Sequence, residues 1–138
     1  MSSIYRFGIS LEKELIDCYD KLIKKQHYSN RSEAIRDLIR KEIVNQSWAD
    51  DKIVAGAISL VFDHHKRQLA NNLLDIQHNY HDLILSSQHI HLDHHNCFEV
   101  ICVRGKACDV QALTHELKAQ KGVAHCELIM SSTGSDLS

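Results

Sequence analysis

Apolar and polar residues alternate strictly near the start of the chain. In "YRFGISL", residues 5–11, the apolar Phe7, Ile9 and Leu11 share one face, as in a half-buried strand. Helical spacing follows, first at Leu15, Ile16, Tyr19, Leu22 and Ile23 and then at Ala34, Ile35, Leu38, Ile39 and Ile43. Ser29 or Asn30 can cap the second helix, where Glu33 suits the first turn. Residues 1–46 are therefore predicted to form a strand and two helices.

The predicted strand has no partner within these residues. Its backbone N–H and C=O groups need hydrogen bonds, and a segment of this length buries little core by itself. We therefore expect this first domain to dimerise by pairing its strand with that of a second copy.

The rest of the chain alternates between strand-like and helix-like patterns. Polar residues 47–52 are interpreted as a linker, residues 53–132 as a second domain and residues 133–138 as a tail. In the second domain, strands are expected at "IVAGAISLVF", "LILSSQHIHL", "CFEVICVRG" and "GVAHCELIM", and helices within 63–79 and around 109–120. The order β-α-β-β-α-β predicts a ferredoxin-like or ACT-like α+β domain.

Histidine is the anomaly in the composition. The chain has 11 histidines, and eight of them lie between His64 and His95. Such a local density is typical of metal binding. Five cysteines, in no disulfide-like spacing, favour free thiols or a metal ligand. With no secretory signal and no apolar run long enough to span a bilayer, we expect a cytoplasmic protein that does not act at membranes.

The candidate metal ligands gather in "HIHLDHHNC". His89 and His91 project from one face of a predicted strand, and Cys97 begins the next strand across a tight turn. A fourth ligand is needed, and the candidates are His78, His81, His94 and His95. Imidazoles with a thiolate suit nickel, copper, cobalt or zinc. Histidines in a polar turn are often only solvated, which is the simpler interpretation of His94 and His95.

The first domain has a candidate DNA-binding face. In a paired ribbon, Arg6, Gly8 and Ser10 would share the face opposite the apolar one, and such a ribbon fits the major groove. The helix start at Asn30, Arg31 and Ser32 offers backbone N–H groups to a phosphate. The net charge of −2 is a weak signal for DNA, so a dimerisation or partner-binding module remains an alternative.

Together the two ends of the chain resemble a known family. "RFGISL" with "HYSNRSEAIRDLIRKEI" resembles the ribbon-helix-helix repressors, and His78, "HIH" at 89–91 and Cys97 resemble the metal-binding domain of the nickel-responsive regulators, NikR. The resemblance implies a homotetramer, a dimer of dimers. It also implies one square-planar Ni(II) per subunit, held by His89, His91 and Cys97 with His78 from a facing subunit.

The resemblance also assigns roles to residues outside the ligand set. Lys66 and Arg67 match positions that touch the DNA backbone, Glu33 and Asp37 match a secondary cation site, and Glu99 matches a position that orients a ligand histidine. The chain departs from the family at Gly8, where relatives often carry a polar residue. It departs again at Phe62, where a tyrosine often supports the metal site, and at Tyr80, which interrupts a histidine run.

These features predict a nickel-responsive regulator that binds a palindromic operator and represses nickel-uptake genes. The alternatives are a ribbon-helix-helix regulator that senses an amino acid or another metal, and a nickel storage or delivery protein. We do not expect an enzyme, because four protein ligands leave no open metal position and no general base is evident. Additional weak metal binding by His64, His65, His81, His94 and His95 stays open.

Overall fold

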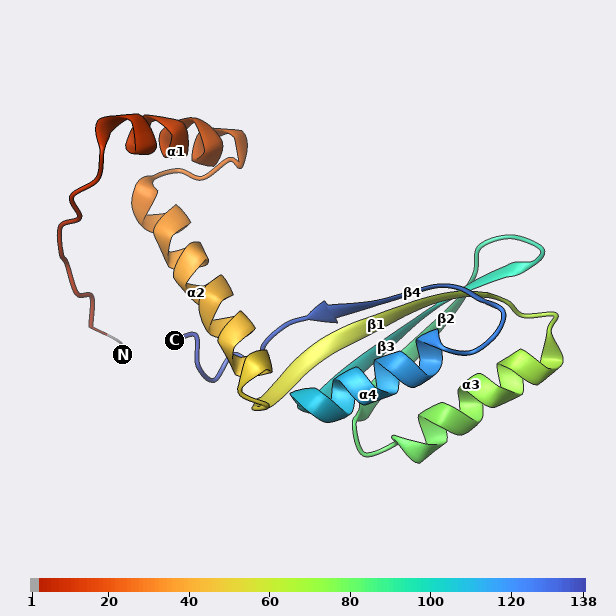
Figure 1. Ribbon diagram of the computed structural model, residues 1–138. Coiled ribbons are helices and arrows are strands. Elements are labelled where there is room, and N and C mark those ends of the chain that lie inside the picture. The colour runs from red at the N-terminus through yellow and green to blue at the C-terminus, as the bar shows by residue number, and fades with distance from the viewer. Residues whose placement is uncertain (1–2) are drawn as a thin grey trace. The chain divides into compact units, whose positions relative to one another are not determined.

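A computed structural model describes residues 3–138 of the chain (Figure 1). The structure divides into two compact units, Met1–Ile43 with Leu137–Ser138, and Val44–Asp136. The division falls within a helix, and each unit is described by itself below.

The first unit contains a pair of helices, as predicted. Helix α1 spans Lys13–Lys25 and α2 spans Arg31–Ala49. Asn30 caps α2, because its side-chain oxygen accepts the backbone N–H of Glu33 at 2.9 Å. Residues 3–12 form neither helix nor strand in the single chain, so the strand expected at 5–11 is not formed here. A strand exists only with a hydrogen-bonded partner, and the partner expected for this one is a second copy of the chain.

The apolar side chains of the first unit are largely uncovered. Only Ile23 and Ala34 are buried among its described residues, whereas nine large hydrophobic side chains are exposed: Ile4, Tyr5, Phe7, Ile9, Leu11, Leu15, Leu22, Leu38 and Ile39. Three of the nine, Phe7, Ile9 and Leu11, form the alternating face of the predicted strand. An exposed apolar surface of this kind is typical of a protein–protein interface.

The second unit has the predicted β-α-β-β-α-β order. Its elements are β1 (Ile53–Asp63), α3 (Arg67–Asn79), β2 (Ile84–His91), β3 (Asn96–Lys106), α4 (Ala107–Lys118) and β4 (Val123–Met130). The four strands form one sheet in the order β2-β3-β1-β4, with every neighbouring pair antiparallel. The mixed α/β fold expected from the sequence, ferredoxin-like in its strand order, is thereby confirmed.

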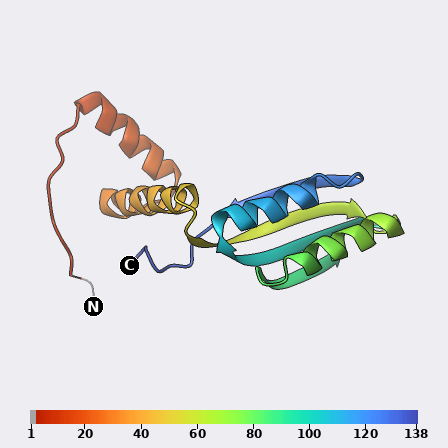
Figure 2. The same cartoon turned by 60° about the horizontal axis from the view of Figure 1, so that its bottom comes forward.

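Both helices of this unit lie on the same face of the sheet (Figures 1 and 2). Alternate residues of β1 and β3 point into this helix-covered face and are buried: Val54, Ile58, Leu60 and Phe62 on β1, and Cys97, Glu99, Ile101 and Val103 on β3. Leu73 from α3 and Leu113 from α4 complete this core. The period-2 pattern of these strands therefore fixes which side chains lie beneath the helices.

The expected linker at 47–52 is wrong in its first half, because α2 continues to Ala49. No glycine or proline stands between Asn45 and Ala49 to break a helix. Trp48 is buried in the core of the second unit, and its indole N–H donates to the backbone oxygen of Ser131 at 3.0 Å. The helix ends only where Asp51 adopts a left-handed conformation with φ of 54°.

Within the described residues, no helix is both long enough and apolar enough to cross a membrane.

Candidate metal centre

The β2–β3 hairpin sets the predicted ligands side by side. Strand β2 is the edge of the sheet, and the register pairs His91 with Cys97 and His89 with Glu99. Residues directly opposite each other in antiparallel strands point to the same face. Since Cys97 and Glu99 are buried beneath the helices, the two histidines lie on that face as well, at its open edge. His89 and His91 thus share one face of β2, which is consistent with the alternation in the sequence.

His89 is held between an aromatic ring and a carboxylate. The ring of Phe62 meets the imidazole edge-on, with centroids 5.6 Å apart. Nδ1 of His89 lies 3.7 Å from a carboxylate oxygen of Glu99. If Nδ1 carries its hydrogen toward Glu99, the free Nε2 can bind a metal ion. Phe62 has no hydroxyl to offer, unlike the tyrosine that relatives often carry at this position. Its ring nevertheless packs against His89.

Glu99 is a buried carboxylate with few partners. Its side chain is only 7% exposed, and besides His89 its one side-chain donor is the amide of Gln77, at 3.0 Å. A buried carboxylate is costly unless it is paired. A carboxylate in this position stabilises a cation bound at His89. Sequence reasoning did not single out Gln77, whose role depends on the packing of α3 against β3.

Cys97 places a sulfur atom on the same face of the sheet, from strand β3. It is fully buried, and burial together with the negative charge of Glu99 raises the pKa of its thiol. The thiolate is the form that binds metals, so binding an ion here must release a proton and offset the burial of the charge. A soft sulfur beside imidazoles suits late transition ions rather than Mg²⁺ or Ca²⁺.

Two imidazoles and a thiolate are ligand types that suit nickel. The described chain does not bring four such ligands together. Among residues 3–138, the donor atoms of His89, His91 and Cys97 are not all within 4.8 Å of one another. His78 lies in the last turn of α3 with an exposed side chain, next to His81, whose ring centroid is 6.0 Å away. The predicted four-ligand site therefore stays a prediction.

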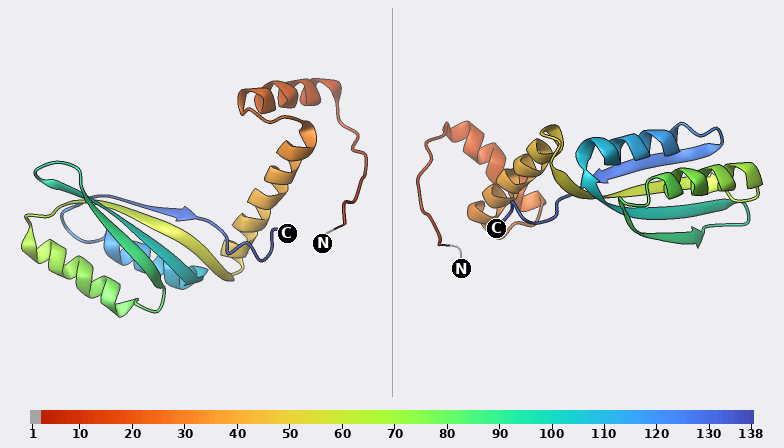
Figure 3. Two further views of the ribbon diagram at one scale, coloured as in Figure 1. Left: turned by 180° about the vertical axis from the view of Figure 1, so that it is seen from behind. Right: turned by 90° about the horizontal axis from the view of Figure 1, so that it is seen from below.

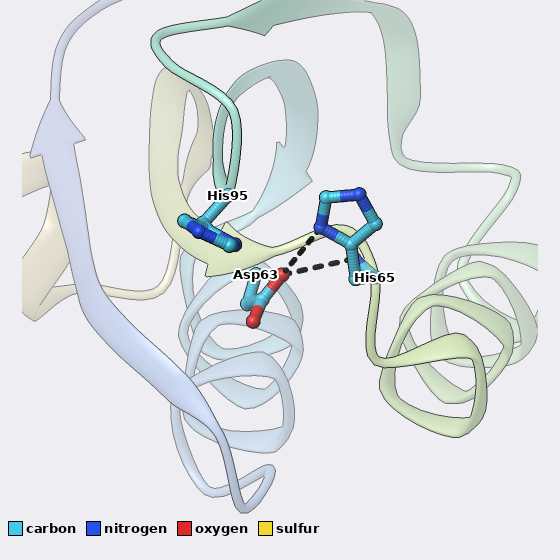
Figure 4. A group of neighbouring side chains, drawn as sticks. All are labelled: Asp63, His65 and His95. Carbon is cyan, nitrogen blue, oxygen red and sulfur yellow. Dashed lines mark hydrogen bonds and ion pairs between the residues drawn. The ribbon is translucent and has the colours of Figure 1, made fainter.

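One group of donors does converge within the described chain, and it is a different one. Asp63, His65 and His95 each place a ligand atom within 4.8 Å of the others (Figure 4). His65 was expected only as a possible weak site, His95 was also a candidate fourth ligand of the main site, and Asp63 was not considered. Asp63 could have been found from its position at the end of β1, which lies beside the β2–β3 turn.

The predicted DNA-facing residues are exposed. Arg6, Gly8, Ser10, Asn30 and Ser32 are all exposed residues of the first unit, and Lys66 and Arg67 are exposed in the second. Arg31 is exposed but engaged, because its guanidinium donates twice to Asp20, at 2.8 and 2.7 Å. The backbone N–H groups at the start of α2 can therefore bind a phosphate, whereas the Arg31 side chain is already paired with Asp20.

The secondary cation site expected at Glu33 and Asp37 is not assembled in the described chain. Glu33 pairs with Arg36 at 2.7 Å, and Asp37 accepts the hydroxyl of Tyr28 at 2.6 Å. Both carboxylates are thus used by neighbours within the first unit. This site, too, stays a prediction.

We expect Glu99→Gln to weaken nickel binding by roughly 10–100-fold, the usual cost of losing the partner that orients a ligand histidine. The amide keeps the shape and the contact with Gln77 but loses the negative charge beside His89. Calorimetric titration with Ni²⁺ measures the effect. Glu127→Gln, which changes an exposed carboxylate on β4, is the matched control. Equal losses in both variants would contradict the assigned role of Glu99.

Comparisons with known proteins point in one direction. Residues 55–131 match the model of the NikR C-terminal nickel-binding domain, and residues 5–46 match the ribbon-helix-helix proteins of the copG family. A relative from Chlorobium limicola, named "Putative nickel-responsive regulator", is 56% identical and covers 97% of this chain and 100% of its own length. A relative of the same name from Syntrophus aciditrophicus is 52% identical, covering 97% and 98%.

A solved structure supports the fold alone. An uncharacterized protein from Thermotoga maritima superposes with a TM-score of 0.52 at 13% identity, covering 56% of this chain and 96% of its own. At that identity, the likeness says nothing of ligands.

The fold and the matched domains define a metal-dependent transcription regulator, with a ribbon-helix-helix DNA-binding domain followed by a nickel-binding domain. The chain belongs to the nickel-responsive regulator family.

Proposed function

We propose that the protein is a nickel-responsive repressor of nickel-uptake genes, acting in the cytoplasm, whose operator binding is promoted by Ni(II). One nickel ion per subunit is held in square-planar geometry by His89, His91 and Cys97, with His78 from a facing subunit. The observation that carries this proposal is the β2–β3 hairpin, which sets two imidazoles beside a buried thiol on an open sheet edge.

The incomplete ligand set supports binding at a subunit interface. The side chain of His89 is 53% exposed and His91 is also exposed, so these two imidazoles face solvent, beside the buried thiol of Cys97. His78 is exposed as well and is therefore available to another copy. When bound, nickel supplies strong bonds to imidazole and thiolate that join ligands from two subunits. Such a site is complete only in the assembled protein.

Two further surfaces support a tetramer built as a dimer of dimers. In the first unit, the exposed side chains of Phe7, Ile9 and Leu11 suit pairing of two ribbons. In the second unit, α3 and α4 leave the opposite face of the sheet uncovered within the described chain (Figure 3). Exposed Ile90 and Ile129 extend from that open face. Apolar surfaces of this kind favour association with further copies.

DNA recognition is assigned to the ribbon and to backbone contacts around it. Two antiparallel copies would present Arg6, Gly8 and Ser10 to the major groove, and the two-fold symmetry of the dimer calls for a palindromic operator. The N-terminus of α2 at Asn30, and the side chains of Lys66 and Arg67, would hold phosphates. Allosteric coupling between the metal and DNA sites is typically worth about 1–3 kcal/mol.

The test is a binding assay with the full chain and fluorescent DNA from its own upstream region and from nickel-transport promoters, with and without Ni²⁺. We expect at least about a tenfold gain in affinity with nickel, the effect of roughly 1.4 kcal/mol of coupling. A response to an amino acid but not to nickel would overturn the proposal in favour of a different sensor. Nickel binding without any specific DNA binding would indicate storage or delivery instead.

A further inference from the structure

A second group of metal-binding side chains lies at the end of the sheet where β1 meets the β2–β3 turn. Asp63 is the last residue of β1, His65 follows in the connection to α3, and His95 belongs to the turn (Figure 4). A carboxylate oxygen of Asp63 lies 3.4 Å from Nδ1 of His65. Each of the three residues offers one ligand atom within 4.8 Å of the other two.

Backbone hydrogen bonds hold the two loops together without any ion. The strand register pairs Asp63 with Asn96, and the N–H of His64 donates to the backbone oxygen of His95 at 3.2 Å. Within the turn, one oxygen of Asp93 accepts the N–H groups of His95 and Asn96, both at 2.8 Å. Segments 30 residues apart in the chain are thus fixed side by side. A site prepared in this way needs little ordering when an ion arrives.

The electrostatics of the group also favour a cation. Asp63 accepts the backbone N–H of His65 at 2.9 Å, which lowers the pKa of its carboxyl and keeps it ionised. The rings of His64 and His94 lie near His65, with centroids 4.2 and 5.2 Å away. The Asp63 carboxylate therefore lies beside the imidazoles of His65 and His95, with two more imidazoles near His65, and each imidazole offers a lone pair when neutral.

We propose that Asp63, His65 and His95 form a second divalent-metal site, distinct from the set built on Cys97. Two imidazole nitrogens and one carboxylate oxygen suit borderline late transition ions such as Ni²⁺, Co²⁺ or Zn²⁺. His65 and His95 are exposed and Asp63 is half-buried, so water completes the coordination. An ion with three protein ligands and open positions facing solvent binds more weakly and exchanges faster than one in a complete four-ligand site.

The second site lies next to the predicted first one. The ring of His64 contacts both His65, at 4.2 Å between centroids, and His91, at 4.7 Å. The two sites differ in chemistry, because the second has no sulfur. A thiolate–nickel absorption band therefore reports the first site alone, and total bound nickel reports both.

Equilibrium dialysis of the full chain against Ni²⁺, read together with that band, tests the proposal. We expect the wild-type protein to bind two ions per chain, the second more weakly. The double variant His65→Gln, His95→Gln should bind one, with the thiolate band and the melting temperature unchanged. The double variant His115→Gln, His125→Gln removes two exposed histidines elsewhere and should still bind two.

Unchanged weak binding in His65→Gln, His95→Gln would overturn the second site, as would equal losses in both double variants. These outcomes are separable from failure of the proposed function. A weak ion that requires His65 and His95, in a protein without a thiolate band, would uphold the second site and remove the first. A single ion that requires Cys97 would do the reverse.

Discussion

Cys97→Ala is expected to abolish nickel-dependent operator binding while leaving the protein folded. Among residues 3–138, Cys97 is the cysteine that the hairpin places beside His89 and His91 on its helix-covered face, and alanine offers no ligand. Loss of a partner that merely orients a ligand already costs roughly 10–100-fold in metal affinity, so loss of the thiolate itself should cost more than about 100-fold. Operator affinity with nickel should then fall to the value measured without it.

Cys126→Ala is the matched control for this experiment. Cys126 is also buried, on β4 in the same sheet, and burial likewise raises the pKa of its thiol. The two substitutions remove the same atom from similar surroundings, so their effects on stability should be similar. Only Cys97→Ala should lose the thiolate–nickel absorption band. A normal nickel response in Cys97→Ala, or its loss in folded Cys126→Ala, would show that the ligand set is wrongly assigned.

Strand patterns made the second unit predictable. Buried positions alternate along β1 from Ile58 to Phe62 and along β3 from Cys97 to Val103, and the helical spacing at Leu69 and Leu73 marks the buried face of α3. The same alternation placed His89 and His91 on one face, because a strand has a period of two and the turn that follows is short. Local periodicity was sufficient wherever the relevant neighbours were close in sequence.

Other features depended on contacts that local periodicity does not encode. Gln77 reaches Glu99 across 22 residues, and Asp63 meets His95 across 32, through packing and register rather than local pattern. The strand expected at 5–11 is absent for a different reason, because the described residues of the single chain give it no hydrogen-bonding partner. Residues 47–49 continue α2 because Trp48 is buried in a core and anchors the end of that helix, a contact that their polar composition does not reveal.

Arg6→Ala is expected to weaken operator binding strongly without changing nickel binding. Arg6 is exposed on the polar face of the predicted ribbon, where an arginine can contact a guanine edge through two hydrogen bonds. Such a contact is worth about 1–3 kcal/mol, and each ribbon dimer carries two copies. The expected loss is therefore at least about tenfold, measured by fluorescence anisotropy with saturating nickel, while calorimetric nickel titrations should match the wild type.

Two further variants separate base reading from simple charge. Arg40→Ala removes an exposed arginine from α2, outside the ribbon, and should leave operator affinity near the wild-type value. Arg6→Lys keeps the charge but cannot form the bidentate hydrogen bond to guanine, so its operator affinity should also fall. Its binding to unrelated DNA, which depends on charge, should be retained. If Arg6→Lys instead restored full operator affinity, Arg6 would act on phosphates. If Arg6→Ala bound the operator normally, the ribbon would not be the reading surface, and the first unit would serve only to join subunits.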